Sequence, residues 1–249
     1  MKKIEASGAT DVGRVRQTNQ DDFLVDLNDH LFVVADGMGG HAGGEVASRL
    51  CVQEVSSYLR THERMMKDGA RKHPDARLGS VLAEAINHAS LKIYEKALEE
   101  PDLKGMGTTS TLLKMVEGHA YCAHVGDSRL YLIRAGFIYQ VTHDHSLVNE
   151  QLRAGLISKE QARLHERKNV ITRSVGYQEY EDVDSFAFAT EPGDFLLICS
   201  DGLHGKLSDE EICNLCRELG CGAVSALIAA ANARGGDDNI TAVIVRVPA

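Results

Sequence analysis

The chain has 249 residues, of which 43% are hydrophobic, so it is long enough to bury a substantial core in one folded unit. Its formal charge of −9 argues against broad attraction to nucleic acid or to an anionic membrane surface. It has no apolar run of about 18 residues and no apolar stretch behind the two lysines near its start, so we expect neither a membrane span nor a signal peptide. These features predict a cytoplasmic protein with one domain, residues 1–249.

Two strands and two long helices are predicted in the first part of the chain. Runs of apolar and β-branched residues predict strands at 23–27 and 31–35. Two amphipathic helices follow, because apolar residues recur at helical spacing. These residues are Ala47, Cys51, Val55 and Tyr58 in the first helix, and Leu78, Leu82, Ile86, Ala89, Ile93 and Ala97 in the second.

Closely spaced strands come next, at 110–116, 119–125, 129–134 and 137–141, and Ala135-Gly136 predicts a tight hairpin between the last two. The segment from about 146 to 169 is charged and lacks a strand pattern, which indicates a surface excursion with helical turns. The remaining predicted elements are a strand at 195–199, helices at 209–219 and 223–233, and a strand at 240–247. This order favours antiparallel sheets covered by helices, an α+β fold, over a parallel doubly wound sheet.

Four apolar strands each have an aspartate at one end: Asp36, Asp127, Asp201 and Asp238, with Asp21 as a possible fifth. Taken singly, each could be an ordinary turn residue. If they converge, their mutual repulsion requires cations, and carboxylate oxygens select hard ions such as Mg²⁺ or Mn²⁺. The repetition of the pattern therefore predicts a site for paired ions.

Paired ions can activate a water molecule for attack on phosphorus, so the protein need not supply a nucleophile. In agreement, the sequence has no G-x-S-x-G elbow, no Walker A loop and no cysteine followed by a phosphate-binding loop. Two other patterns are weaker. Gly37-x-Gly39-x-x-Ala42 resembles a dinucleotide fingerprint but lacks the acidic residue after a second strand. A zinc site at Cys213, Cys216 and Cys221 lacks a second pair of ligands.

Seven motifs in order resemble the bacterial members of the PP2C-type, or PPM, metal-dependent protein phosphatases. The resemblance runs from about Thr10 to Val247. Its motifs are GRVRQTNQDD at 13–22, VVADGMGGHAGGEVAS at 33–48, GTTSTLL at 107–113, HVGDSRLYL at 124–132, VTHDHSL at 141–147, ICSDGLHGKLSDEEI at 198–212 and DDNITAVIV at 237–245.

The resemblance implies a four-layer αββα sandwich, with two antiparallel sheets flanked by helices. It implies that Asp36 bridges two Mn²⁺ or Mg²⁺ ions, that the carbonyl of Gly37 binds one of them, and that Asp201 and Asp238 complete the pair. Asp21 would act mainly through water. Asp127 would hold, with Asp201, a third and weaker ion.

The same resemblance assigns the substrate phosphate to Arg16, with Arg14 as the alternative, and makes the segment at about 146–169 a flap beside the active site. His41 is either the general acid or a residue that orders the glycine loop. The chain departs from family patterns at Gln20, where many members have glutamate, and at Met38, where animal-type members have histidine.

Three other histidines lie close to the motifs. His204 could reach the site, but we interpret it as an exposed loop residue. We interpret His143 and His145 as turn residues that anchor the flap.

The expected activity is hydrolysis of phosphoserine and phosphothreonine in proteins, opposing a bacterial serine/threonine kinase. The expected partners are phosphorylated proteins, including such a kinase or its substrates, and neither nucleic acid nor membrane. A monomer is expected. Two alternatives share the fold: a pseudophosphatase that binds phosphoproteins without turnover, and a metal-dependent hydrolase of small phosphate esters. All the metal carboxylates are present, which argues against the pseudophosphatase.

Overall fold

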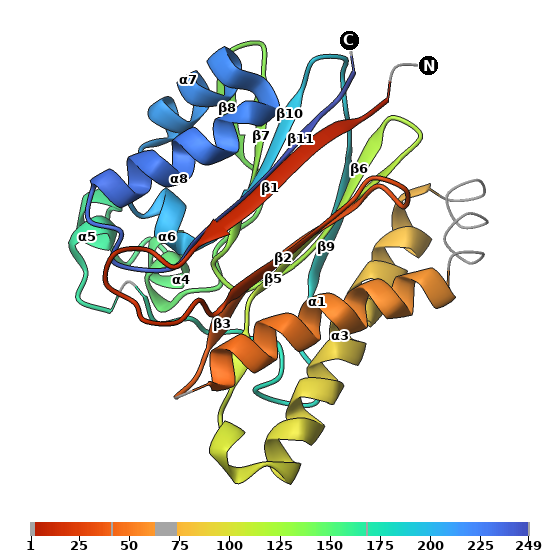
Figure 1. The fold of residues 1–249 in the computed structure, drawn as a ribbon, viewed down its shortest axis with the longest axis vertical. Helices are drawn as coiled ribbons and strands as arrows, with labels where there is room; N and C mark the ends of the chain where they lie inside the picture. The colour runs from red at the N-terminus through yellow and green to blue at the C-terminus, as the bar shows by residue number, and fades with distance from the viewer. Residues whose placement is uncertain (1–2, 41, 63–73, 168, 249) are drawn as a thin grey trace.

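A computed structural model describes residues 3–40, 42–62, 74–167 and 169–248. The strands form two antiparallel sheets (Figure 1). The first sheet has the order β1 (Glu5–Asp11), β11 (Ile240–Arg246), β10 (Phe195–Cys199), β7 (Arg129–Arg134) and β8 (Phe137–Gln140). The second has the order β2 (Asp21–Asp26), β3 (Leu31–Met38), β5 (Ser110–Val116), β6 (His119–Val125) and β9 (Asp184–Ala189), and the short β4 (Gly107–Thr108) pairs with β3.

Helices cover the outer face of each sheet, so the molecule has four layers (Figure 1). The second sheet carries α1 (Gly43–Thr61) and α3 (Pro74–Glu99), which is followed by the 3₁₀ turn η1 (Pro101–Leu103). The first sheet carries α6 (Asp201–His204), α7 (Asp209–Leu219), the 3₁₀ turn η2 (Gly220–Gly222) and α8 (Ala223–Ala233). The αββα sandwich expected from the family resemblance is confirmed.

The central strands are buried on both faces, which explains their nearly continuous apolar sequences. In β3, Leu31, Val33 and Ala35 belong to the core beneath α1 and α3. Phe32 and Val34, which point the other way, pack between the two sheets. Because successive side chains of a strand alternate between faces, one apolar run supplies two separate cores.

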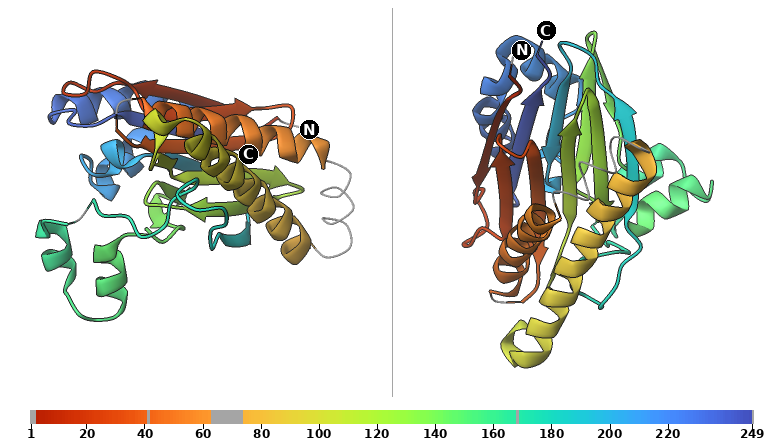
Figure 2. Two further views of the ribbon diagram at one scale, coloured as in Figure 1. Left: turned by 90° about the horizontal axis from the view of Figure 1, so that it is seen from below. Right: turned by 90° about the vertical axis from the view of Figure 1, so that its right-hand side faces the viewer.

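The segment predicted as a surface excursion contains two short helices, α4 (Leu147–Arg153) and α5 (Lys159–Leu164). Figure 2 shows both standing out from the sandwich. Ser146 caps the first helix, and Ser158 forms a capping box with Gln161 at the start of the second. An isolated bridge between Ser146 and Ile171 closes the base of this segment, which we call the flap.

The sequence patterns missed β1, β4, β9 and the single turn α6. The sequence of β1, EASGATD, has few β-formers, yet it pairs with β11 along its whole length. Its Gly8 leaves room for the neighbouring sheet, because a Cβ there would lie 2.7 Å from Cε2 of Phe23 on β2. Tertiary pairing, rather than local propensity, therefore forms β1.

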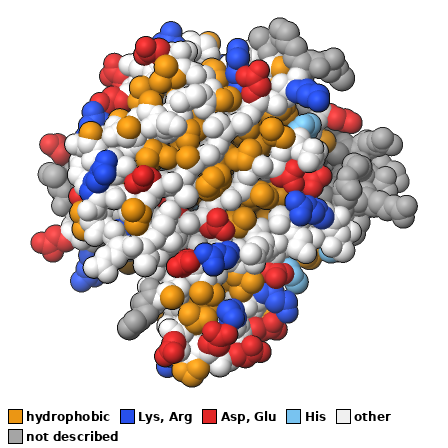
Figure 3. All heavy atoms as spheres, viewed as in Figure 1, with side chains coloured by type: hydrophobic (Ala, Val, Ile, Leu, Met, Phe, Trp, Pro, Cys, Tyr) orange, Lys and Arg blue, Asp and Glu red, His pale blue; other side chains and the backbone are white. Residues whose placement is uncertain are grey.

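Figure 3 shows the face of the molecule on which β1 and β2 lie, with hydrophobic side chains among interspersed acidic and basic groups.

The hairpin predicted at Ala135-Gly136 is confirmed, with both residues at positive φ, 50° and 86°. By length and composition alone, the stretch Asp209–Ala233 could cross a membrane, whereas the sequence analysis expected no membrane span. It is broken at Gly220, where φ is 58°, and apolar residues of α7 and α8 join the core over the first sheet.

Candidate active site

Asp21 and Asp36 lie directly opposite each other on the paired strands β2 and β3. Like charges at such positions repel, because directly opposite side chains project from the same face of the sheet. The backbone of Asp36 is fixed by two threonines. Its N–H donates to Oγ1 of Thr109 at 2.9 Å, and its carbonyl accepts from Oγ1 of Thr108 at 2.9 Å. Burial first, and then the charge of Asp21 and the other carboxylates, raise the pKa of Asp36 well above its ordinary value.

One oxygen of Asp21 is bonded and the other is not. Oδ2 accepts from the hydroxyls of Ser200 at 2.8 Å and Thr241 at 2.6 Å. Oδ1 is buried and has no hydrogen-bond partner. Burial raises the pKa of Asp21 to about 7, against the effect of these two hydroxyls. A buried carboxylate with a free oxygen is costly unless a cation or a bound water satisfies it.

Asp201 and Asp238 lie at adjacent ends of the antiparallel strands β10 and β11. Asp201 opens α6, and Asp238 lies two residues before the start of β11. The two segments approach closely at Gly202, where a Cβ would lie 2.0 Å from the carbonyl oxygen of Asn239. Only glycine allows this approach, which brings the two aspartates to the same edge of the sandwich.

Asp127 follows β6 in a turn that starts at Gly126, whose φ is 110°. A Cβ on Gly126 would lie 2.5 Å from Cγ2 of Thr109, the residue that also holds Asp36. The hydroxyl of Thr109 is 2.8 Å from that of Ser128, so the two aspartate segments share a hydrogen-bond chain. Burial, followed by the charges of Asp201 and Asp144, raises the pKa of Asp127 to about 7.

The carboxylates therefore lie close enough to repel one another. Within residues 3–40, 42–62, 74–167 and 169–248, no three His, Cys, Asp or Glu side chains have the geometry of one metal site. The two observations are compatible, because a hard cation needs ligands within about 2.0–2.6 Å whereas carboxylates repel over longer distances. The all-oxygen donor set and the unsatisfied Oδ1 of Asp21 fit Mg²⁺ or Mn²⁺.

Arg16 points at these carboxylates. Its Nη2 donates to Oδ2 of Asp238 at 2.8 Å, and this bond raises the pKa of Arg16, with further contributions from the charges of Asp201 and Asp36. The Arg16 side chain is half exposed, at 52% of its surface. Arg14, the alternative phosphate ligand, is attached to another segment through its N–H, which donates to Gly236.

The loop that carries Arg16 is anchored by Asn239, a buried residue beside Asp238. Its Oδ1 accepts from the N–H of Gln20 at 2.8 Å, and its Nδ2 donates to the carbonyls of Val12 and Thr18. Gly37 adjoins the same loop, because a Cβ there would lie 2.5 Å from the carbonyl oxygen of Gln20 and 2.0 Å from that of Gly44. This close packing explains the glycine, and its role as a carbonyl ligand stays a prediction.

Four histidines were considered from the sequence, and the structure describes three of them. His41 lies outside the described residues. The interpretation of His204 as an exposed loop residue was wrong, because it lies in α6, is partly buried, and has Nε2 3.1 Å from the carbonyl oxygen of Asp127. Burial lowers the pKa of His204 to about 3, so the ring is neutral. His145 is buried at the base of the flap as an anchoring residue, and the carbonyl of His143 accepts from His124.

The sequence patterns missed the uncharged residues that orient the aspartates: Thr109, Ser200, Asn239 and Thr241. Each lies within three residues of a predicted aspartate or within a quoted motif, and that proximity was the available signal. Their partners are remote, however, since Thr241 and Asp21 are separated by 220 positions.

Comparison with known proteins identifies the family. Residues 12–233 match protein phosphatase 2C. The serine/threonine phosphatase stp of Listeria monocytogenes is 38% identical over 97% of this chain and 95% of its own length. The structure of the serine/threonine phosphatase Stp1 from Staphylococcus aureus has a TM-score of 0.89 and 32% identity, with 100% of this chain and 96% of that chain covered. The catalytic domain of the phosphatase PstP, in complex with two manganese ions, has a TM-score of 0.85 and 31% identity, with 99% of each chain covered.

The family match and these relatives span most of the chain, and the relatives are named as serine/threonine phosphatases. The fold has the layers and the antiparallel pairing expected from the motifs. The chain belongs to the protein phosphatase 2C family and is a metal-dependent protein serine/threonine phosphatase.

Proposed function

We propose that the chain hydrolyses phosphoserine and phosphothreonine monoesters at the edge where both sheets present aspartates. The observation that carries this proposal is the convergence of Asp21, Asp36, Asp127, Asp201 and Asp238, of which four act on the pKa of Asp36. Residues of both sheets contribute, so we also propose that residues 1–249 act as one phosphatase domain, with a flap at about 146–169.

Asp36, the carbonyl of Gly37, Asp201 and Asp238 would hold two Mn²⁺ or Mg²⁺ ions, with Asp21 acting through water. When bound, such ions lower the pKa of a water molecule between them and offset charge on the phosphate oxygens. The protein's own contribution is to hold the oxygens in place. Thr108 and Thr109 orient Asp36, and the hydroxyls of Ser200 and Thr241 leave only Oδ1 of Asp21 available.

Arg16 would bind the substrate phosphate, because its planar guanidinium can donate two parallel hydrogen bonds to phosphate oxygens. Its loop is anchored by Asn239, so substrate and ions would be positioned by adjacent residues. Asp127 and Asp201 would hold a third, weaker ion. The general acid is assigned to His41 only by family resemblance.

The proposed substrates are phosphorylated proteins in the cytoplasm, including a cognate serine/threonine kinase or its targets, acted on by a monomer. The charge of −9 disfavours nucleic acid and anionic membranes as partners. All six cysteines are free thiols and five are buried, which suits a reducing compartment.

Turnover of three substrates tests the proposal: a phosphothreonine peptide, a nucleotide and single-stranded DNA, each with Mn²⁺. We expect release of phosphate from the peptide to be fastest. Preferential hydrolysis of the nucleotide would favour the small-ester alternative instead, and peptide binding without turnover would favour the pseudophosphatase.

A further inference from the structure

Each residue of the turn Gly126–Arg129, which carries Asp127, is held by a contact with another segment of the chain. Gly126 is held twice by His145. The N–H of His145 donates to the carbonyl of Gly126 at 2.7 Å, and the N–H of Gly126 donates to Nδ1 of His145 at 3.1 Å. Nε2 of His204 is 3.1 Å from the carbonyl oxygen of Asp127, and the hydroxyl of Ser128 is 2.8 Å from that of Thr109.

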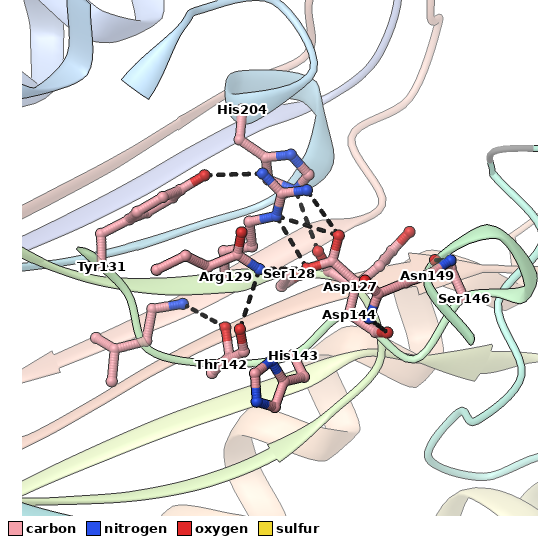
Figure 4. Close-up of polar contacts among 12 residues, drawn as sticks. Asp127, Ser128, Arg129, Tyr131, Thr142, His143, Asp144, Ser146, Asn149 and His204 are labelled. Carbon is pink, nitrogen blue, oxygen red and sulfur yellow. Dashed lines mark hydrogen bonds and ion pairs between the residues drawn. The ribbon is translucent and has the colours of Figure 1, made fainter. Parts of the chain in front are cut away.

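Arg129, the last residue of the turn, forms a two-point ion pair with Asp144. Its Nε donates to Oδ1 at 2.9 Å and its Nη2 donates to Oδ2 at 2.7 Å. Figure 4 shows this pair beneath His204, with Nη1 of Arg129 directed at the hydroxyl of Tyr131. Only 23% and 13% of the two side chains are exposed, so water screens the pair weakly.

The residues that hold the turn, Asp144 and His145, also form the base of the flap. The carbonyl of Asp144 accepts from Nδ2 of Asn149 in α4 at 2.7 Å. The carbonyl of His145 accepts from the N–H of Thr172 at 2.8 Å, on the segment that returns from the flap to the sandwich. One short segment therefore contacts both the flap and the turn of Asp127.

A second ion pair formed by an arginine of β7 serves as a comparison, because it lies away from the proposed site. At the other end of β7, Arg134 donates from Nε and Nη2 to the two oxygens of Asp194 at 2.9 and 2.7 Å. The bonding matches that of Arg129 with Asp144. Asp194 contacts the turn at Glu191 and the chain near Val247, and neither belongs to the proposed site. Arg134 also donates from Nη1 to Glu191 at 2.8 Å, so the two pairs share the two-point bonding to an aspartate but differ in their other partners and in location.

We propose that Asp144 and His145, at the base of the flap, are positioning residues that hold Asp127 in the orientation in which it contributes to the weaker ion site. Asp144 acts through Arg129 and His145 acts through Gly126, on either side of Asp127. The inference rests on the proposed role of Asp127 and adds the residues on which that role depends. Outer residues that orient a metal ligand typically alter metal affinity by about 10- to 100-fold when they are replaced.

The first test compares Asp144→Asn with the matched control Asp194→Asn, using calorimetric titration of the metal-stripped proteins with Mn²⁺. Asp144→Asn should weaken the third binding event by roughly 10- to 100-fold and leave the two tighter events unchanged. Asp194→Asn should leave all three unchanged, although it loses the same kind of ion pair. Equal Mn²⁺ affinities for Asp144→Asn and the wild type would overturn the proposal.

If Asp144→Asn does not fold, a second pair of variants, at His145, tests the proposal. In His145→Asn the amide oxygen can take the place of Nδ1 and still accept from Gly126, whereas in His145→Gln the amide takes the place of Nε2. His145→Asn should therefore retain the weaker ion and His145→Gln should lose affinity for it. A residue that only fills space would give equal affinities in both variants, and that result would contradict the proposal.

Asp127→Asn separates failure of the inference from failure of the proposed function. This variant should abolish the third binding event, and adding Asp144→Asn to it should have no further effect on Mn²⁺ binding, because both changes act on the same ligand. If Asp127→Asn leaves three events, the proposed role of Asp127 is wrong and the inference falls with it. If Asp127→Asn removes the event while Asp144→Asn and His145→Gln do not weaken it, only the inference is wrong.

Discussion

At the scale of single residues, the site is a set of buried and half-buried carboxylates that destabilise one another. Asp21 and Asp36 face each other across two strands, and burial raises the pKa of both. Such an arrangement is costly for folding and useful for binding divalent cations. Function and stability should therefore respond in opposite directions when one charge is removed.

Asp36→Asn tests whether activity and stability change in opposite directions. The variant removes the charge that we propose bridges the two ions, so kcat should fall more than tenfold, a change above about 1.4 kcal/mol. In a chelating buffer, the same variant should unfold at a higher temperature than the wild type, because one of several repelling charges has been removed. Turnover by phosphate release and unfolding by calorimetry are the two measurements. Retention of more than about a tenth of the wild-type rate would show that Asp36 is not the bridging ligand.

Arg16→Ala tests the phosphate ligand. A charge-assisted hydrogen bond contributes about 1.5–3 kcal/mol, so kcat/KM for a phosphothreonine peptide should fall roughly 10- to 150-fold. Arg16→Lys should recover part of the loss, since it restores a point charge without the planar fork. Arg14→Ala is the control and should be nearly silent. The reverse result, with Arg14→Ala damaging and Arg16→Ala silent, would assign the phosphate to Arg14.

At the scale of elements, the loop between β1 and β2 depends on one side chain from the other end of the chain. Asn239 makes three hydrogen bonds to this loop and is buried. Asn239→Ala should lower the free energy of unfolding by about 2 kcal/mol or more, because buried loop groups lose their partners. It should also raise KM, since the loop carries Arg16. Urea denaturation and peptide kinetics measure the two effects.

The surface variant Asn28→Ala is the control for Asn239→Ala and should change neither quantity, since Asn28 is exposed in the turn between β2 and β3. If Asn239→Ala left KM unchanged at wild-type stability, the loop would not depend on Asn239.

Strand β6 carries a histidine that the fold keeps neutral. Nε2 of His124 is 3.2 Å from the carbonyl oxygen of His143, which can only accept, so this nitrogen carries the hydrogen, and Nδ1 accepts from Thr111 at 2.9 Å. Burial lowers the pKa of His124 from 6.5 to about 4. The unfolded chain therefore takes up a proton first as the pH falls, and the folded state loses stability between these two values.

Because of His124, the free energy of unfolding should decrease by on the order of 3 kcal/mol as the pH drops from 6.5 to about 4. His124→Gln should flatten that part of the profile, measured by urea denaturation at a series of pH values. His119→Gln, at the opposite end of β6, should keep the wild-type slope. Parallel profiles for the wild type and His124→Gln would contradict a neutral, buried His124.

At the scale of the whole molecule, the sequence predicted most of the elements because the central strands and helices have strong apolar patterns. Strands β5, β6, β7 and β10 and helices α7 and α8 have the predicted bounds. Strands β1 and β9 were not predicted, because they form by pairing with β11 and β6, which lie far from them in sequence.

The candidate site, too, could be predicted only in part from the sequence. The five aspartates could be proposed from repeated strand-edge motifs, whereas their hydrogen-bond partners could not. Ser200 and Thr241 bond to Asp21 across 179 and 220 positions. The environment of His204 was mispredicted for the same reason, because its partner, the carbonyl of Asp127, is 77 positions away.

The central claim is that the converging aspartates form a metal-dependent phosphatase site, and the most direct test is phosphate release from a phosphothreonine peptide by the metal-stripped protein. We predict no turnover in EDTA, and recovery when Mn²⁺ or Mg²⁺ is added in excess of the chelator. Ca²⁺ should restore little activity, because it accepts looser geometry and more ligands than the smaller ions. Full activity in EDTA, with the protein verified to be free of metal, would contradict the account.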